Sequence, residues 1–205
     1  MNRPLLLVLF VIVVAAGVMF PGTVFAEPAN SVNFGIGASN FLPHCKGTIY
    51  LIEYERMLGS KISAVGRVSE VHYTFDDGEH IEDGRPKGAD IGLRYYPSGG
   101  MKGFFIGGLL GYWESDWTFT HNNNLPDEFH GNGHSNSIRA NVDIGGRFPI
   151  GSSSVSIMPA LNFGRYFSST SCEFTAPASR VGTACHEDSE VTFYAFLAVT
   201  AGIAF

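Results

Sequence analysis

The sequence has few cysteines, little charge and, after its first 26 residues, no long hydrophobic run. Only 3 Cys occur among 205 residues, and Asp, Glu, Lys and Arg together make up 16%. Without a run of about 18 apolar residues, the chain beyond that point is not expected to form a membrane helix. No basic run suggests a nucleic-acid partner. Gly (25 residues) and Phe (17) are instead abundant, which favours antiparallel β-sheet over helix.

The N-terminus predicts export. Arg3 precedes an uncharged apolar run from Leu5 to Phe20, and Val24-Phe25-Ala26 supplies the small residues that a signal peptidase reads. We expect residues 1–26 to be a cleaved signal peptide and residues 27–205 to form one domain. The alternative is a retained anchor, although an apolar run of about 16 residues is just too short to span a bilayer.

Eight segments alternate apolar with polar or small residues, the period of a two-faced β-strand. They are residues 32–38, 48–56, 62–75, 89–96, 103–119, 138–148, 155–167 and 191–205. The faces of residues 103–119 cannot be assigned, because apolar residues occupy both parities. The predicted fold is all-β: an eight-stranded antiparallel up-and-down transmembrane barrel in which the last strand pairs with the first.

The connections between these strands alternate in length. Those after the second, fourth and sixth strands are short, whereas residues 76–87, 120–136 and 168–188 form long polar links, and the link after the first strand is intermediate. Short turns at one end and long loops at the other are typical of outer-membrane barrels. An even strand number places both chain ends on the short-turn side.

Charged residues lie opposite the apolar face of these strands. They are Glu53, Glu55, Arg67, Asp90, Arg94, Arg139, Asp143 and Arg147. A small barrel in lipid turns its apolar face outward and can pair opposite charges inside. Because eight strands leave room for little more than side chains, we expect a plugged lumen. The alternative is a soluble barrel of the lipocalin kind, with an apolar core.

Several stretches resemble a known family. Residues 53–57 (Glu-Tyr-Glu-Arg-Met), 92–97 and 102–105 are similar to segments of small eight-stranded outer-membrane barrels, such as the outer-membrane protein A transmembrane domain and opacity-type surface proteins. Residues 191–205 resemble the C-terminal signal of such barrels. The resemblance implies that Phe205 is read by the barrel assembly machinery and that outer-membrane lipid and lipopolysaccharide surround the protein. It also implies a structural or adhesive role, through surface loops that bind an unknown extracellular ligand.

Two other functions stay open as alternatives, a lipid A-modifying enzyme and a narrow solute channel. His134 and Ser135 are adjacent in a predicted loop, and no acidic orienting residue follows at an obvious strand position. A lipid A deacylase of the outer membrane carries a similar His and Ser on a strand, with the Ser two positions after the His. Six histidines fall in predicted outer loops: His44, His80, His121, His130, His134 and His186. Such imidazoles could gather zinc or copper, but surface histidines are the simpler interpretation. We expect no enzyme activity, cofactor or metal.

Three cysteines can form at most one disulfide bond with each other, so one thiol is expected to stay unpaired. Cys172 and Cys185 lie in the same predicted loop, where a local bond would restrain it. Cys45, placed in the first outer loop, is an alternative partner for either, since sequence does not fix connectivity. We expect the Cys172–Cys185 bond.

Overall fold

The computed structural model describes residues 29–38, 44–121, 129–175 and 191–205. Within these ranges all regular structure is β-strand, and no helix there is long and apolar enough to cross a membrane. The strands are β1 (Asn30–Ala38), β2 (Cys45–Met57), β3 (Ile62–Asp76), β4 (His80–Gly84), β5 (Lys87–Tyr95), β6 (Gly103–His121), β7 (Phe129–Pro149), β8 (Val155–Thr175) and β9 (Val191–Ala204).

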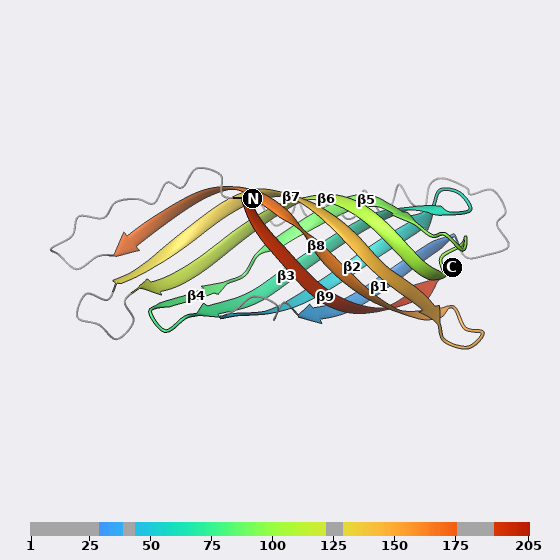
Figure 1. The fold of residues 1–205 in the computed structure, drawn as a ribbon, viewed down its shortest axis with the longest axis horizontal. Helices are drawn as coiled ribbons and strands as arrows, with labels where there is room; N and C mark the ends of the chain where they lie inside the picture. The colour runs from blue at the N-terminus through green and yellow to red at the C-terminus, as the bar shows by residue number, and fades with distance from the viewer. Residues whose placement is uncertain (1–28, 39–43, 122–128, 176–190) are drawn as a thin grey trace.

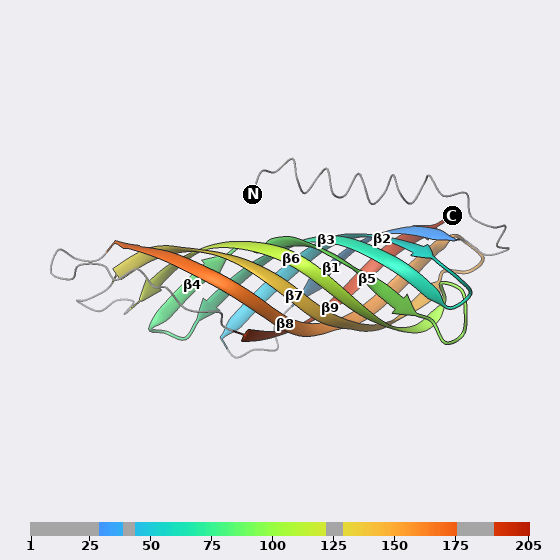
Figure 2. The same ribbon diagram turned by 90° about the horizontal axis from the view of Figure 1, so that it is seen from above.

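The strands close into a barrel and tilt around its long axis (Figure 1, Figure 2). Every neighbouring pair is antiparallel, and β1 pairs with β2 on one side and with β9 on the other. β4 and β5 share one position in the wall between β3 and β6, so the barrel has eight strand positions. The predicted eight-stranded antiparallel barrel, closed by its last strand on its first, is confirmed.

Residues 76–87 are not the loop that the sequence suggested. β4 pairs with Tyr73–Asp76 of β3 and with Trp117–His121 of β6, which would otherwise leave backbone groups unpaired. The hydrogen-bond ladder of β4 ends before Pro86. The carbonyl of Pro86 still accepts a hydrogen bond from the amide of Val71 (2.7 Å). The prediction failed because residues 80–84 do not alternate apolar with polar residues.

The other two predicted outer loops are also partly strand. β6 runs to His121, β7 begins at Phe129 and β8 runs to Thr175, whereas loops were expected at residues 120–136 and 168–188. These parts of β6, β7 and β8 carry mostly polar side chains. A β-ladder can still form there, because its hydrogen bonds use only the backbone. The remaining parts of the predicted loops, residues 122–128 and 176–190, lie outside the described residues.

Both described chain ends lie at the short-turn end of the barrel. The amide of Asn30 donates to the Phe205 carbonyl (3.0 Å), and the amide of Phe205 donates to the Asn30 carbonyl (2.8 Å). The turn after β5 uses Gly99 and Gly100 at φ of 77° and 65°, a left-handed conformation that glycine adopts at little cost. All short turns and both ends therefore share one side, as an even barrel requires.

Candidate functional site

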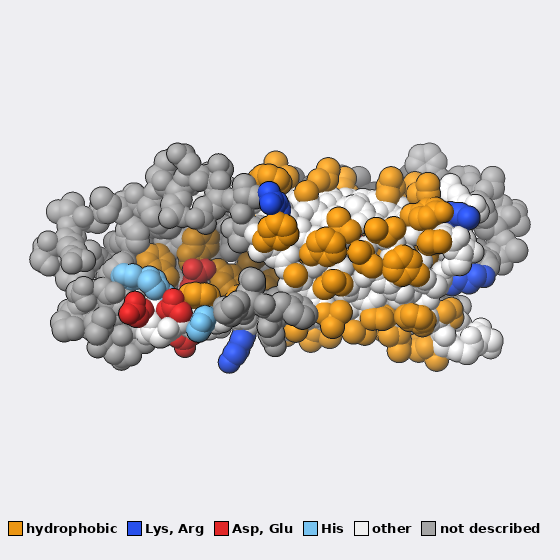
Figure 3. Space-filling model, in the orientation of Figure 1, with side chains coloured by type: hydrophobic (Ala, Val, Ile, Leu, Met, Phe, Trp, Pro, Cys, Tyr) orange, Lys and Arg blue, Asp and Glu red, His pale blue; other side chains and the backbone are white. Residues whose placement is uncertain are grey.

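The outer wall of the barrel is apolar along most of its length. In Figure 3, hydrophobic side chains cover this wall, while Asp, Glu and His gather beyond one end. Among the exposed large hydrophobic residues are Phe34, Ile36, Ile52, Ile91, Leu93, Ile106, Leu110, Ile138, Phe148, Ile157, Leu161, Leu197, Val199 and Ile203. A continuous apolar surface of this kind is rare on soluble monomers and marks contact with an apolar medium or a partner.

β6, whose faces the sequence left unassigned, contributes to both sides of the wall. Phe105, Leu109 and Trp113 are buried inside, whereas Ile106 and Leu110 are 43% and 62% exposed outside. Apolar residues occupy both parities because the inner ones fill the lumen and the outer ones belong to the apolar wall.

The eight charged residues named from the sequence are all buried inside, none more than 3% exposed. Six of them meet around Arg94 of β5. Its Nη1 lies 2.6 Å from Glu53 Oε1 and 3.1 Å from Glu55 Oε2, and its Nη2 bonds Asp143. Arg67 Nη2 lies 2.9 Å from both Glu53 Oε2 and Asp143 Oδ2. These bonds cross the lumen from β5 and β3 to β2 and β7.

Arg147 extends this group toward the short turns. Its Nη2 lies 2.6 Å from Glu55 Oε2 and 3.1 Å from the Ser31 hydroxyl of β1. Tyr96 donates its hydroxyl hydrogen to Glu55 Oε1 at 2.8 Å. A carboxylate that accepts several charge-assisted hydrogen bonds is held in one orientation, so Glu55 ties β2 to β5 and β7, and Arg147 adds Ser31 of β1.

The remaining pair, Asp90 and Arg139, lies toward the other end. Arg139 Nε bonds Asp90 Oδ1 at 3.1 Å, and the Trp113 indole donates to the same oxygen at 3.1 Å. The guanidinium lies 4.0 Å from the centre of the Trp113 ring, within range of a cation–π contact. Gly111 makes room for this pair, because a Cβ there would overlap the Asp90 carboxylate.

Apolar clusters fill the lumen on both sides of the ion pairs. Tyr96, Phe105, Met158 and Ala160 pack near the short turns, and Ile49, Leu51, Trp113, Phe196 and Ala198 pack toward the opposite end. The eight charged residues named from the sequence are four arginines and four carboxylates, so their formal charges cancel. The lumen is thus occupied by a neutral, cross-bonded set of side chains.

Beyond the apolar wall, several strands of the barrel continue as a sheet, called here the extension. It comprises residues 45–48, 70–87, 114–121, 129–136 and 168–175. Among the described residues, β1 ends at Ala38 and β9 begins at Val191, so neither described strand runs along the extension. Figure 1 shows β3, β4, β6, β7 and β8 projecting past the start of β9.

The polarity of the outward face reverses where the extension begins. On β6 the residues on the outward face change from Leu110 and Tyr112 to Glu114, which is buried, and to the exposed Asp116. Tyr112 pairs with Ile138 of β7, and Glu114 pairs with Asn136, so the reversal falls at the same register in both strands. It continues across Lys87 of β5 and Glu70 of β3, which pair in the same row. The boundary is therefore shared by four adjacent strand positions.

The outer face of the extension carries a hollow of about 980 Å³ lined largely by polar residues. Three side-chain pairs border it: His134 Nδ1 with Asp116 Oδ1 at 2.7 Å, His72 Nε2 with Glu70 Oε1 at 2.9 Å, and Thr74 Oγ1 with Asp83 Oδ1 at 2.7 Å. Its charged and hydroxyl groups suit a polar partner more than an apolar one.

The inner face of the extension is aromatic. Tyr73 of β3 donates its hydroxyl hydrogen to Glu82 of β4, and the Trp117 ring covers Gly133 of β7. Burial raises the pKa of Tyr73, and the neighbouring Glu82 raises it further. Burial also raises the pKa of Glu82, against the lowering effect of the Tyr73 hydrogen bond.

His134 and Ser135 do not form a catalytic pair. Both lie on β7 and not in a loop, and adjacent strand residues point to opposite faces: Ser135 is buried inside, and His134 bonds Asp116 on the outer face. The acidic partner of His134 is Asp116, which precedes it in the sequence. Sequence reasoning missed Asp116 because the contact depends on the β6–β7 register.

The other described histidines have partners of several kinds. His130 Nδ1 lies 2.9 Å from Thr120 Oγ1, and His44 stacks edge-on with Phe75. His80 and His121 are in ring contact, with centroids 3.9 Å apart. Within the described part of the chain, no three or more His, Cys, Asp or Glu side chains are grouped as metal ligands. His186 lies outside the described residues.

The cysteine pairing stays a prediction. Cys172 falls within β8 and not in a loop, and Cys185 lies outside the described residues. Cys45 is the first residue of β2, also not in a loop, and it forms no disulfide with a described residue. Burial raises the pKa of its thiol, and the nearby Glu82 raises it further.

Comparison with solved structures identifies the fold. The translocator domain of the autotransporter NalP from Neisseria meningitidis aligns over 97% of this chain and 95% of that chain, at 10% identity and a TM-score of 0.55. A major outer membrane protein from Thermus thermophilus aligns over 86% of this chain and 100% of that chain, at 14% identity and a TM-score of 0.53. The fold is that of an outer-membrane β-barrel. No protein-family model and no curated protein matches the sequence.

Proposed function

We propose that this protein is an integral outer-membrane barrel whose extension mediates contacts at the cell surface, by adhesion or by shielding. The observation that carries the proposal is the apolar outer wall around an interior of ion pairs. In water this arrangement exposes a large apolar surface, whereas in a bilayer it satisfies both faces of every strand.

The filled lumen favours a structural role over conduction. Ion pairs cross it from β5 and β3 to β2 and β7, and apolar clusters pack at both ends of this set. Conduction needs a continuous wet path with sites that an ion can leave. We therefore rank a channel below a surface role, and discrete conductance steps in planar bilayers would reverse this order.

The extension supports the surface role. Its outer face carries the polar hollow and the His134–Asp116, His72–Glu70 and Thr74–Asp83 pairs, and its β-ladder holds these groups in fixed positions. Binding groups on a regular scaffold are positioned more accurately than groups on loops. Adhesion or shielding would then use a sheet surface in addition to the connecting segments.

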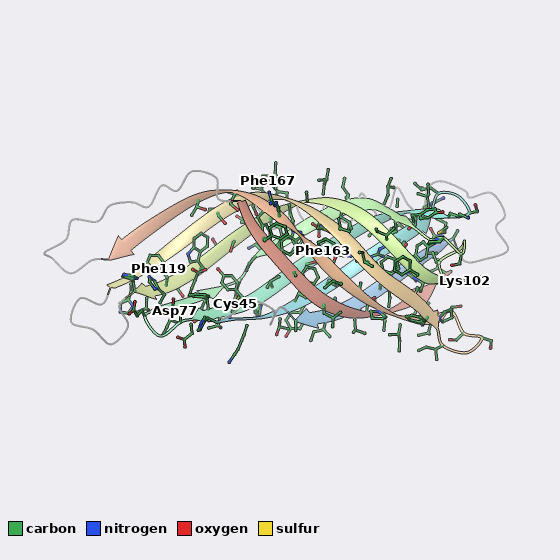
Figure 4. All side chains as sticks on the ribbon, viewed as in Figure 1. Cys45, Asp77, Lys102, Phe119, Phe163 and Phe167 are labelled. Atoms are coloured by element: carbon green, nitrogen blue, oxygen red, sulfur yellow. The ribbon has the colours of Figure 1, made fainter. Side chains whose placement is uncertain are left out.

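Lysine labelling tests the proposed orientation. The chain has lysines at positions 46, 61, 87 and 102: Lys46 and Lys87 on the extension, Lys61 and Lys102 at the short turns. Figure 4 shows Lys102 at the end opposite Asp77. A membrane-impermeant amine reagent should label the exposed Lys46 in intact cells, and Lys61 and Lys102 only after permeabilisation. Mass spectrometry reads the result.

Two outcomes would contradict the proposal. Labelling of Lys61 and Lys102 in intact cells would reverse the orientation. Purification as a monodisperse protein without detergent would show that the apolar wall does not face lipid. Retention of heat-modifiable gel mobility is the control for folding in both experiments.

The proposed role is not catalytic, and lipid A provides the check. His134 is the candidate base of the enzyme alternative, and its strand neighbour Ser135 faces the other side of the sheet. Lipid A from expressing cells should keep the acylation pattern of cells that lack the protein. A change that disappears in His134→Ala would establish the enzyme instead.

A further inference from the structure

Two histidines face each other at the far end of the extension. His80 of β4 and His121 of β6 are direct register partners, and their ring centroids lie 3.9 Å apart. They point to the inner face of the sheet, since their strand neighbours Ile81 and Thr120 form the pair that faces outward. Two strands therefore bring together imidazoles that are 41 positions apart in the sequence.

A carboxylate is fixed beside this pair by the β3–β4 turn. Asp77 Oδ1 accepts hydrogen bonds from the amides of His80 (2.7 Å) and Glu79 (3.1 Å). Its other oxygen, Oδ2, lies 3.7 Å from His80 Nδ1. The hydrogen bonds from the His80 and Glu79 amides lower the pKa of Asp77, which keeps it ionised. Figure 4 marks the position of Asp77 at this end of the molecule.

The rings lie closer together than they would on a shared metal ion, so binding requires the two side chains to rotate apart. Metal–nitrogen distances of about 2.0–2.1 Å place two imidazoles on a tetrahedral ion with ring centres about 5 Å apart. Rotation of the side chains from 3.9 Å to this spacing needs no change in strand register. Imidazole nitrogen favours zinc and copper over magnesium or calcium, which prefer oxygen ligands.

We propose that His80 and His121 bind one divalent late transition-metal ion, Zn²⁺ or Cu²⁺, through their two imidazoles, with the Asp77 carboxylate as a nearby negative charge. Water completes the coordination, because no third His, Cys, Asp or Glu among the described residues joins this pair as a ligand. Such an ion bridges β4 to β6 and fixes the end of the β3–β4 hairpin. This inference is independent of the proposed surface role.

The histidines elsewhere on the described extension offer single imidazoles with oxygen partners. His72 pairs with Glu70, His134 with Asp116, and His130 with Thr120. His72 is the matched control, because it lies on the outer face of β3 while the proposed site lies on the inner face of β4 and β6. A surface effect common to all histidines would affect His72 as much as His80.

Metal titration of the refolded chain in detergent micelles tests the site. Calorimetry with ZnCl₂ alone and with CuCl₂ alone should show one saturable site per chain. His80→Gln and His121→Gln should each weaken it by at least the roughly 10- to 100-fold that loss of a supporting residue costs a metal site. His72→Gln should leave it unchanged. Binding should weaken as the pH falls, since protons compete for imidazole nitrogen.

Electron paramagnetic resonance of the Cu²⁺ complex tests the unmodified chain, so that a variant that fails to fold does not leave the question open. The wild-type spectrum should show two imidazole nitrogens and the His80→Gln spectrum one. A wild-type spectrum with a single nitrogen, the absence of saturable binding, or an equal loss in His72→Gln would overturn the proposal.

Discussion

The body of the barrel and its extension are built from the same strands but present opposite faces to their surroundings. On β7, Ile138 and Ile144 point outward in the body, whereas Asn132 and His134 point outward in the extension. The alternation continues without a break, and only the polarity of the outward residues changes. The medium around each part, and not the strand itself, therefore explains which residues face out.

The interiors differ as well. The body is closed around four arginines and four carboxylates, all within 3% exposure. Within the described residues, neither β1 nor β9 continues along the extension, whose inner face carries aromatic side chains such as Tyr73 and Trp117. Stability is thus expected to reside in the body, while the extension is expected to tolerate substitution.

Removal of Arg94 should have the largest effect. Arg94→Met leaves Glu53, Glu55 and Asp143 without their shared cation, and loss of one partner from a buried ion pair costs about 3–5 kcal/mol. Urea unfolding of the protein in lipid vesicles measures the loss. Lys61→Met, at an exposed turn, is the control. Equal stability of the two variants would show that the ion pairs do not hold the body together.

A charge introduced on the outward face should destabilise the body much more than the extension. Leu110→Arg places a cation in the apolar wall and should lower the free energy of unfolding by about 2 kcal/mol, as charges on the lipid face of barrels do. Thr118→Arg lies on the same face of the same strand within the extension and should cost little. Similar losses in the free energy of unfolding at the two positions, measured in vesicles, would contradict a boundary between body and extension.

The His134–Asp116 contact of the extension should matter less for stability than the buried ion pairs of the body. Asp116→Asn weakens a solvent-exposed contact with His134 and should cost at most about 1 kcal/mol, less at high salt. Asp90→Asn, in the buried pair with Arg139, is the matched variant and should cost several times more. Comparable losses in unfolding experiments would contradict the assignment of stability to the body.

Substitution of Glu82 should have the smallest effect on stability. Burial raises its pKa in the folded protein, so its favourable contribution is present below the unfolded value of about 4.3 and is lost as the pH rises through the folded value. Glu82→Gln does not titrate. Hydrogen exchange of β4, compared between the two proteins at each pH, should show the wild type less protected than the variant only at the higher pH. A ratio of protection between wild type and variant that does not change with pH would contradict this prediction.

The body could be predicted from the sequence because two signals coincide there. Apolar residues alternate with charged ones, so the period of a strand and the identity of its inner face are both visible, as along residues 138–148. The eight charged residues assigned to one face are all buried in the structure. Phe205 could be placed beside the first strand because the last strand closes the barrel.

The extension could not be predicted in the same way. Residues 130–136 carry polar or small side chains on both faces, and residues 80–84 include a single large apolar one, Ile81, so no apolar alternation shows where the ladder continues. Contacts between strands depend on register, which the sequence does not reveal. For this reason His134–Asp116 and His80–His121 became visible only in the folded chain.

Spin labels along β6 test the boundary between body and extension most directly. With the three native cysteines replaced by Ser, single labels at the even positions 104–120 can be probed in vesicles with oxygen and with a water-soluble nickel complex. Labels at 104–112 should be accessible to oxygen, and labels at 114–120 to nickel. Nickel access at every even position would contradict a lipid-facing wall.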